Sequence, residues 1–418
     1  MQAADLGIVP EGERQQSPLD LFLIFAGANI VATTLQTGAA LVPAFSIRSA
    51  LVLVLVGSLG GALLVALLSP IGPRLGVPSV VAARAALGFR GAATVALVLF
   101  VSNFAWIAIN NVIAASACAR VLGGPATEGA WAFGLGLLAT AIAAGGPRAV
   151  GLADRLAVPL LVVVGLLLTV ACLRLPGEVF AAPGDGTLTW PRGLDVVAGY
   201  QVSWLLMFAD YSRYTASAKK GAVAVFCGLG LTSLWFMPLG FAAARAAGNS
   251  DPGAMLAAVG LGASGALLLT LATLTTNFVN LYLSALAWKS LVPRSSDRLS
   301  LWSIGLVGAA LSLFQRGWLD RYADFMLVLG ALLVPVGGIL LSHFFILASP
   351  VRAEELYDRN GRYGLGAAFP LAAAAAWGLG AVTFFVAAPI GGTVPSLAVS
   401  VGVHALLARR AATATAQR

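Results

Sequence analysis

Long apolar stretches, separated by short polar or Gly/Pro-rich connections, occupy most of the chain. Each stretch is roughly 20 residues long, which suits a helix that crosses a hydrocarbon core of ~30 Å at a rise of ~1.5 Å per residue. The apolar residues are continuous and do not alternate with period two, which argues against a β-barrel. The pattern predicts twelve transmembrane helices, at residues 19–44, 49–71, 92–121, 128–145, 156–173, 194–212, 220–246, 255–288, 299–315, 323–348, 365–388 and 390–408.

These spans also predict how the chain is organised. The first and sixth spans both carry small or polar residues at mid-depth, and they lie five spans apart. Because five is odd, a second unit related to the first would be inverted in the membrane. The small residues have two interpretations: an interruption of each helix, or close packing of intact helices at glycine. The expected segments are a tail at 1–17, a ten-helix core at 18–348 with repeats at about 18–175 and 193–348, two additional helices at 349–408 and a tail at 409–418.

Composition supports a membrane protein and predicts its orientation. Hydrophobic residues make up 59% of the chain and charged residues 10%, whereas ordinary soluble domains carry about 25% charged residues. If the N-terminus is cytoplasmic, 18 of the 25 Lys and Arg residues fall on the cytoplasmic side, as the positive-inside rule requires. We therefore expect an all-α polytopic protein of the inner membrane with both termini cytoplasmic. The net charge of +8 comes from loops, and no basic patch interleaved with aromatic residues indicates nucleic-acid binding.

Several function classes have no support in the sequence. Cys118, Cys172 and Cys227 lie in apolar stretches without metal-ligand spacing, and no Walker motif or catalytic triad occurs. We therefore expect neither an enzyme nor an ATP-driven pump, no organic cofactor and no obligatory protein partner. Acidic residues are also missing at mid-membrane depth, so the coupling ion is more plausibly Na⁺ than H⁺. His343 can be read as a packed interface residue or as a proton relay.

Polar residues that lie deep in four spans are the candidate binding groups. An unsatisfied polar group in lipid costs several kcal/mol, so these side chains are expected to face a shared interior. Gly27 and Asn29 represent the first span, and Trp106 with Asn110 represents the third. Trp106 and Asn110 lie four residues apart on one helix face, and an indole beside a carboxamide suits a flat heteroaromatic solute. Alternatively, Trp106 packs against lipid or a neighbouring helix while Asn110 bonds to another helix.

Asn103 and Asn111, in the same span, are expected to be structural, because they lie on other faces of the helix. In the sixth span, Gln201, Ser203 and Trp204 lie close together. If the helix is unwound near Gly199, backbone groups also become available to a solute. The alternative is a hydrogen bond between helices beside a packing tryptophan.

Hydroxyl and amide oxygens in the eighth span suit a hard cation such as Na⁺. Thr275, Thr276 and Asn277 are consecutive, and Asn280 follows within one turn. Carbonyl groups released at a break around Gly27–Ile30 would complete the ligand shell. The alternative is that the threonine hydroxyls bond back to the preceding helical turn.

Asp210 and Arg213 close the sixth span at its inner end. One interpretation is an inner gate held by a contact between the two side chains. The other is a capped helix end with a basic anchor at the membrane interface.

Three motifs resemble one family. The run Gly72–Pro78 followed by Arg84–Gly91 is similar to the loop between the second and third helices of nucleobase:cation symporter-1 proteins, the purine–cytosine permease family. The Trp106/Asn110 pair resembles the third-helix tryptophan of that family, which is followed four residues later by an amide. Asp210–Tyr214 resembles its sixth-helix signature, and Ser203-Trp204-Leu205 is similar to the hydroxymethylpyrimidine branch. The resemblance extends over about residues 18–390.

The resemblance implies twelve helices, a five-plus-five inverted repeat of the leucine-transporter type with interrupted helices 1 and 6, and alternating access. It implies uptake of a nucleobase or related flat heterocycle, often with Na⁺. By the same likeness, Trp106 stacks on the ring, Asn110 binds its edge and Ser203 supplies a hydroxyl. Thr275 and Thr276 match the eighth-helix Na⁺ ligands, and a carbonyl could come from Ala272.

The chain departs from the family pattern at two places. Gln201 stands where the cytosine and hydantoin permeases carry a stacking aromatic residue. Leu271 and Ala272 lack a polar side chain that the cytosine permease has nearby. Both departures argue against simple cytosine specificity.

Together these features predict a secondary transporter that imports a pyrimidine, hydroxymethylpyrimidine or similar heteroaromatic solute by cation symport. Two alternatives remain: a proton-coupled carrier of an amino acid, vitamin or purine on the same fold, and an uncoupled channel or receptor. The expected solute contacts are Trp106, Asn110, Gln201, Ser203, Trp204, Gly27, Asn29, Asn277 and Asn280. The expected Na⁺ contacts are Gly27, Ile30, Ala272, Thr275 and Thr276.

Overall fold

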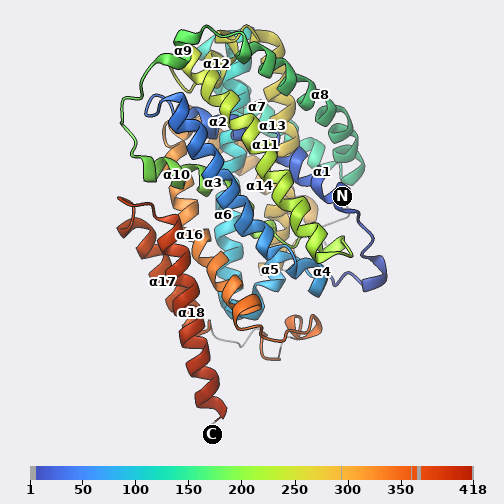
Figure 1. The fold of residues 1–418 in the computed structure, drawn as a ribbon. Coiled ribbons are helices and arrows are strands. Elements are labelled where there is room, and N and C mark those ends of the chain that lie inside the picture. Colours follow the sequence, from blue (N-terminus) through green and yellow to red (C-terminus); the bar gives the residue numbers. More distant parts are fainter. Residues whose placement is uncertain (1–5, 293, 359, 365–368, 417–418) are drawn as a thin grey trace.

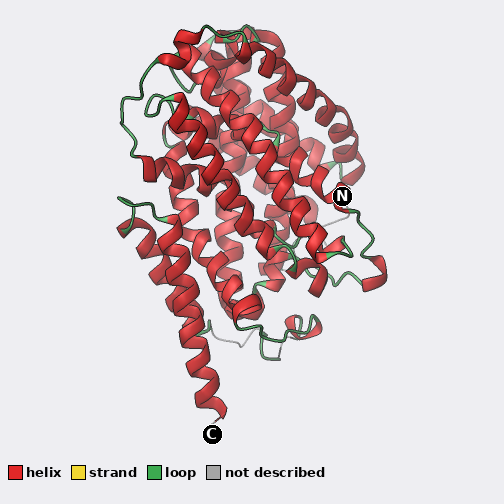
Figure 2. Ribbon diagram, in the orientation of Figure 1, coloured by secondary structure: helices red, strands yellow, loops and turns green. Residues whose placement is uncertain are grey.

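The computed structural model describes residues 6–292, 294–358, 360–364 and 369–416. In this part of the chain every regular element is a helix, and the single pairing of extended backbone is the isolated bridge between Gln16 and Thr215 (Figures 1 and 2). The expected all-helical class is confirmed. The first half of the chain forms α1 Pro18–Asn29, α2 Ala32–Ala39, α3 Ile47–Leu68, α4 Ile71–Leu75, α5 Ser79–Ala82, α6 Arg84–Leu122, α7 Glu128–Ala144, α8 Pro147–Leu173 and α9 Gly177–Ala181. The second half forms α10 Trp190–Val202, α11 Ala218–Ala247, α12 Pro252–Ala258, α13 Gly262–Leu291, α14 Asp297–Leu311, α15 Arg316–Asp320, α16 Tyr322–Leu341, α17 Leu371–Val386 and α18 Thr393–Ala416.

The lengths of these helices agree with the predicted spans. Among the described residues, seven helices are long and apolar enough to cross a bilayer alone, and the bent pair α1/α2 makes an eighth. Pro159–Leu173 and α17 are shorter apolar helices. With α10 and α18 the set is consistent with twelve spans.

Some boundaries differ from the prediction. The span expected at 255–288 is divided, because α12 is a separate short helix and α13 begins only at Gly262. The third span was expected from residue 92, but α6 begins at Arg84. Its helical geometry is interrupted at Gly88, whose φ of 64° is one that glycine adopts without strain. Helix α18 continues to Ala416, through most of the segment expected as a tail. Residues 1–5 of the expected N-terminal tail, 365–368 of the eleventh span and Arg359 and Arg418 lie outside the described residues.

The first span is broken between α1 and α2, which meet at an angle of 57°. The start of α1 is stabilised by a capping box in which Ser17 and Asp20 bond to each other's backbone, with Pro18 at the first helical position. Helical geometry then ends at Ile30, and Val31 is extended. The predicted interruption therefore exists at mid-span.

The sixth span also loses its α-helical form, three to four residues later than expected. Helix α10 stays regular through Gly199 and ends at Val202, where the chain tightens into the 3₁₀ helix Ser203–Met207. A Cβ atom at Gly199 would lie 2.4 Å from the Met326 carbonyl oxygen. Gly199 therefore serves the close approach of α10 and α16, and the break falls at Ser203.

Two glycines bring α2 against α11. A Cβ atom at Gly38 would lie 1.8 Å from the Met237 carbonyl oxygen, and one at Gly240 would lie 1.9 Å from the Leu35 carbonyl oxygen. Small residues allow membrane helices to approach at backbone distance. This packing holds α2 in its bent position and so fixes one side of the space between the two broken spans.

Candidate functional site

A cavity of about 530 Å³ lies beside the two helix breaks. Its wall is formed by side chains or backbone from α1, α2, α6, α10 with its 3₁₀ extension, α13 and α16. These are the first, third, sixth, eighth and tenth spans. The cavity extends along α1 towards Leu23 and Asp20, near the start of that helix. Its wall includes Gly27, Ala28, Thr33, Asn103, Trp106, Tyr200, Ser203, Trp204, Thr275, Thr276 and Asn280.

Trp106 is held at the cavity by a group of aromatic rings. Its ring centroid lies 6.1 Å from that of Tyr200, 6.4 Å from Tyr322 and 5.2 Å from Phe325, each in an edge-to-face arrangement. Such contacts fix the orientation of an indole without covering its whole surface. Trp106 lines the cavity and does not point into lipid.

Several polar side chains lie on this wall, among them Ser203, Asn280, Asn103 and Trp204. The Ser203 hydroxyl donates to the Tyr200 carbonyl at 2.6 Å, and its remaining lone pair can accept. Asn280 donates weakly to Asn277 at 3.4 Å. The buried nitrogen Asn103 Nδ2 has no hydrogen-bond partner among the described residues, and the indole N–H of Trp204 lies close to the Tyr200 hydroxyl.

Asn103 was expected to be structural, and its position at the cavity wall is a correction. It lies three residues before Trp106 on α6, so the two share one face of the helix. The i, i+3 spacing of Asn103 and Trp106 already indicated in the sequence that both face the same side of the helix.

Asn110 and Asn277 lie outside the cavity wall, which corrects two expected solute contacts. Asn110 is fully buried, and its amide donates back to the Trp106 carbonyl at 2.8 Å. Asn277 donates to Asn111 Oδ1 at 2.8 Å, and Asn111 in turn donates to the Ser312 hydroxyl. Asn277 and Asn111 thus bind α6 to α13 and to the segment that follows α14, whereas the Asn110 side chain bonds within α6 and not to another helix.

Asn29 and Gln201 also point away from the cavity. The amide of Asn29 donates to Thr232 and Ser233 of α11, at 2.8 and 2.7 Å. Gln201 donates to the same Ser233 hydroxyl at 2.5 Å. Both side chains are fully buried, and a Cβ atom at Gly61 would collide with Gln201. They therefore join both broken spans to α11, instead of lining the solute space.

The expected Na⁺ ligands fall into two groups. Gly27, Thr275 and Thr276 line the cavity, whereas Ile30 and Ala272 are buried behind it. Both threonine hydroxyls donate to the Ala272 carbonyl, at 3.0 and 2.7 Å. This oxygen is saturated as the helix stands, which is a correction to its expected role as a ligand.

At the break itself, carbonyl oxygens are available. Within the described part of the chain, no backbone amide or side chain donates to the carbonyls of Gly27 and Ala28. Carbonyl and hydroxyl oxygens are the groups that a hard monovalent cation prefers. The carbonyl oxygens of Gly27 and Ala28, together with the hydroxyl oxygens of Thr275 and Thr276, are therefore suitable ligands for Na⁺.

Asp210 and Arg213 do not form a direct ion pair among the described residues, although the charge of Arg213 acts on the Asp210 carboxyl. The two ion pairs found among the described residues are Arg120–Asp251 and Lys289–Asp297. Asp210 instead accepts from the Ser79 amide at 3.4 Å, at the start of α5, and Arg213 donates to the Gly7 carbonyl and the Tyr214 hydroxyl. The capped-end interpretation describes this geometry better than a gate made of the pair.

Tyrosine hydroxyls close the end of the cavity opposite to Asp20. Tyr200 is hydrogen-bonded to Thr34 at 2.6 Å, and Tyr322 to Thr37 at 2.8 Å and to the Thr33 carbonyl at 3.0 Å. These contacts join α2 to α10 and α16. Neither tyrosine was among the residues expected at the site. Tyr200 stands directly before Gln201, on the face it shares with Ser203 and Trp204.

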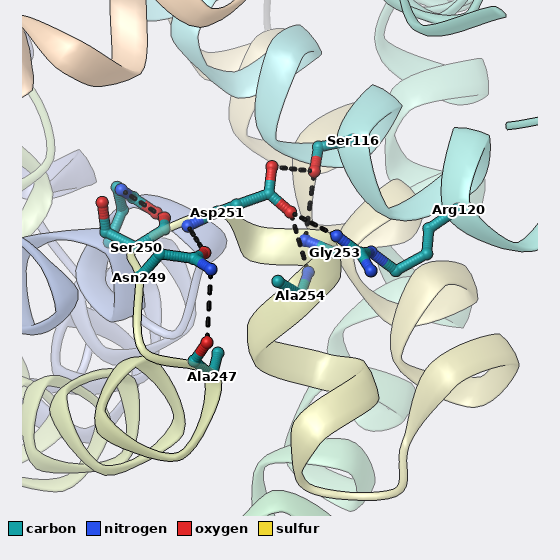
Figure 3. Close-up of polar contacts among 9 residues, drawn as sticks. Ser116, Arg120, Ala247, Asn249, Ser250, Asp251, Gly253 and Ala254 are labelled. Atoms are coloured by element: carbon teal, nitrogen blue, oxygen red, sulfur yellow. Dashed lines mark hydrogen bonds and ion pairs between the residues drawn. The ribbon is translucent and has the colours of Figure 1, made fainter. Parts of the chain in front are cut away.

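Polar contacts at the start of α12 also stabilise this end of the cavity, and Figure 3 shows them. Asp251 caps α12 through the Ala254 amide, accepts from the Ser116 hydroxyl of α6 at 2.8 Å and pairs with Arg120 at 3.4 Å. The Ser250 carbonyl accepts from the Gln36 side chain of α2 at 3.1 Å. The loop before α12 thus links the bent part of the first span to α6.

His343 lies in the short π-helical turn Ser342–Ile346 at the end of α16, away from the cavity wall. Its ring centroid is 6.1 Å from that of His404 in α18. His404 is hydrogen-bonded to the Ser342 hydroxyl at 2.9 Å. This packed position agrees with the interface interpretation.

Comparison with known proteins gives a consistent result. A family model described as permease for cytosine/purines, uracil, thiamine, allantoin matches residues 8–406. A Bacillus subtilis (strain 168) protein named "Putative purine-cytosine permease YxlA" is 24% identical over 377 residues, which is 85% of this chain and 82% of that protein.

Solved structures show the same fold. Mhp1, a nucleobase-cation-symport-1 family transporter, matches in a closed conformation with bromovinylhydantoin bound (TM-score 0.83, 19% identity, 98% of this chain and 95% of that chain). Its inward-facing conformation matches with a TM-score of 0.84, 19% identity, 97% of this chain and 93% of that chain. A Na⁺-coupled sialic acid symporter matches more distantly (TM-score 0.56, 13% identity, 96% of this chain and 93% of that chain). The predicted leucine-transporter type of fold, with its first and sixth helices interrupted, is confirmed, while the repeat boundaries at 18–175 and 193–348 stay predictions.

Proposed function

Because the chain belongs to the family of permeases for cytosine/purines, uracil, thiamine and allantoin, we propose that it imports a small flat heteroaromatic solute together with a cation. The observation that carries the proposal is the cavity at the two helix breaks, with an oriented indole and polar atoms on one wall. A ring can stack on Trp106 while its edge is read by hydrogen bonds. This combination gives both affinity and selectivity for planar heterocycles.

The solute contacts follow from the atoms that reach the cavity. Trp106 supplies the stacking surface, Ser203 supplies an acceptor, and the Asn280 amide supplies a group that both donates and accepts. Asn103 carries a buried amide donor without a partner in the described chain, and Trp204 carries an indole N–H. The wall offers both donors and acceptors, so a planar solute with carbonyl or ring-nitrogen acceptors beside N–H donors fits best. Pyrimidines, hydroxymethylpyrimidine and hydantoins all have this character.

The coupling cation is proposed to be Na⁺, held between the break in the first span and α13. The carbonyls of Gly27 and Ala28 and the hydroxyls of Thr275 and Thr276 are its ligands. Support comes from the carbonyls without donors and from the absence of Asp and Glu, apart from Asp20 at its end, among the described residues that line the cavity. An ion that favours the solute-competent state links the two gradients.

The direction of transport depends on the orientation of the chain. With the N-terminus and C-terminus cytoplasmic, as the distribution of Lys and Arg favours, the cavity extends towards the cytoplasm and the tyrosine contacts close the outer end. The conformation described here is then inward-facing. Import requires a second state in which those contacts open and the wall near Asp20 closes.

A ligand-stabilisation screen of the purified protein tests the proposal. Nucleobases, hydroxymethylpyrimidine, hydantoins, allantoin and pyridoxine are each added in Na⁺ and in choline, and the melting temperature is recorded. We expect one chemical class to raise the melting temperature in a saturable way, and more strongly in Na⁺. Uptake of that solute into proteoliposomes against its gradient distinguishes a coupled carrier from a channel. Equal uptake with either salt and dependence on a pH gradient would instead identify proton coupling.

A further inference from the structure

A second hollow lies on the outer surface of the protein, lined by residues other than those of the solute cavity. This groove has a volume of about 600 Å³ and runs between α3, α11 and the end of α16. Every side chain that lines it is apolar. Its walls include Leu63, Leu67, Pro70, Val223, Phe226 and Phe345. It shares no lining residue with the solute cavity.

Two basic side chains stand at one end of the groove. The Arg74 guanidinium lies 5.2 Å from the centroid of the Phe345 ring, which lines the groove. Lys219 lies four residues before Val223 on α11, so it is one turn away on the same helix face. Helix α4, which carries Arg74, contacts α11. In Figure 1 this end of the groove is the end of the molecule where α4 and α5 lie.

Neither basic group has an acidic partner. Both side chains are exposed, and the two ion pairs found in the described residues involve other groups. The cation–π contact fixes the Arg74 guanidinium beside the apolar groove but leaves its hydrogen-bond donors free. An apolar channel that ends at two uncompensated cations is complementary to an amphiphile with an anionic head.

We propose that this groove binds an anionic phospholipid, with one acyl chain along α3 and α11 and the head group at Arg74 and Lys219. The inference rests on the proposed orientation, which places this end of the molecule at the cytoplasmic leaflet. That leaflet is where anionic lipids meet basic residues at the ends of transmembrane helices. The acyl chain explains the apolar walls, and the charged head group explains why the two cations have no acidic partner among the described residues.

The size of the effect can be estimated from the charges. A basic residue near an anionic membrane surface contributes about fivefold in affinity, so replacing both should weaken binding by roughly 25-fold. The loss should shrink as salt is raised, because exposed charges are screened within ~10 Å at 0.1 M. A zwitterionic lipid with the same chains should bind more weakly to the parent protein and lose little in the variant.

The test uses the full-length protein, delipidated in detergent. Native mass spectrometry counts bound dioleoylphosphatidylglycerol and dioleoylphosphatidylcholine as each is titrated. We expect saturable and tighter binding of phosphatidylglycerol, and reduction to the phosphatidylcholine level in Arg74→Gln/Lys219→Gln. The control Arg90→Gln/Arg410→Gln removes the same charge from exposed positions away from the groove and should keep the preference. Glycerol phosphate alone should bind far more weakly, because it lacks the chain.

Three results would overturn the proposal. Equal binding of the two lipids, or equal losses in both double variants, would show that head-group charge at this groove does not select lipid. A protein that is dimeric in light scattering and becomes monomeric in Val223→Trp, with unchanged lipid binding, would show that a second copy covers the groove. The lipid assay contains no transported solute, so a negative result does not contradict the proposed function. Equally, a negative solute screen does not affect the interpretation of the lipid assay.

Discussion

Trp106 shows how single residues prepare the cavity before any solute arrives. Three rings from α10 and α16 meet the indole edge-to-face, at centroid distances of 5.2 to 6.4 Å. Because the indole is already oriented, a solute that stacks on it does not have to order or repack this side chain, and that cost is not subtracted from its affinity. The polar atoms around it come from separate helices, so their spacing is set by helix packing and not by a loop.

Replacing Trp106 with Ala should remove the stacking surface and weaken solute binding by roughly 5- to 150-fold. The range corresponds to the ~1–3 kcal/mol measured for base–aromatic stacking. Isothermal titration with the solute found in the screen checks it. Trp131→Ala is the matched control, because Trp131 lies on α7 outside the cavity wall. Retention of affinity in the Trp106 variant would remove this residue from the site.

Thr276→Val should abolish the effect of Na⁺ on solute affinity while leaving affinity in choline close to that of the parent. The substitution keeps the shape of the side chain and deletes the oxygen proposed as a ligand. Thr270→Val is the control, since Thr270 makes the same bond to the preceding turn of α13 without lining the cavity. The ratio of dissociation constants in the two salts is the quantity to measure. A ratio unchanged by Thr276→Val would reject this ion site.

Much of the molecule could be predicted at the level of helices, because bilayer thickness fixes their length and each apolar run is bounded by polar or Gly/Pro residues. The break in the first span was also predictable from its polar centre. It was harder to predict which side chain on each helix faces the cavity. Successive residues turn by about 100°, so Gly27 faces the cavity while Asn29, two positions on, faces α11.

The same geometry explains the sixth span. Tyr200, Ser203 and Trp204 share one face and line the cavity, whereas Gln201 is turned towards Ser233. Sequence proximity identified the cluster but could not assign its members to the cavity or to a neighbouring helix. That assignment depends on where α11 packs, which is a tertiary property.

The contact between α2 and α11 gives a prediction at the scale of elements. Gly38→Ala places a methyl group where the Met237 carbonyl oxygen now lies, so the two helices must separate. We expect a loss of about 1–3 kcal/mol, as for other overpacked interiors, seen as a lower melting temperature. Gly60→Ala is the control, because nothing lies within 4 Å of the added Cβ on α3. A variant at Gly38 as stable as the one at Gly60 would contradict the close approach described here.

For the whole molecule, the two ends of the cavity are built from different chemistry. Towards Asp20 the cavity is open along α1, and the opposite end is held by four hydroxyl groups and by the loop before α12. Hydrogen bonds of this kind contribute only about 0.5–1.5 kcal/mol each. A closure held by a few of them can be reversed by the modest binding energy of an ion or a solute, as alternating access requires.

Tyr322→Phe should therefore shift the protein towards the state that is open at the other end. The substitution deletes the bonds to Thr37 and to the Thr33 carbonyl and keeps the ring that packs on Trp106. The loss of two bonds at ~0.5–1.5 kcal/mol each, ~1–3 kcal/mol in all, corresponds to a roughly 5- to 150-fold larger population of the open state. A Thr33→Cys reporter in the cavity wall, with Cys118, Cys172 and Cys227 replaced by Ala, reads that population through its labelling rate with an impermeant maleimide in right-side-out vesicles. Labelling should accelerate in Tyr322→Phe and stay constant in Tyr363→Phe, a buried tyrosine outside the spans. An unchanged or slower rate in Tyr322→Phe would mean that these hydroxyls do not hold the outer end closed.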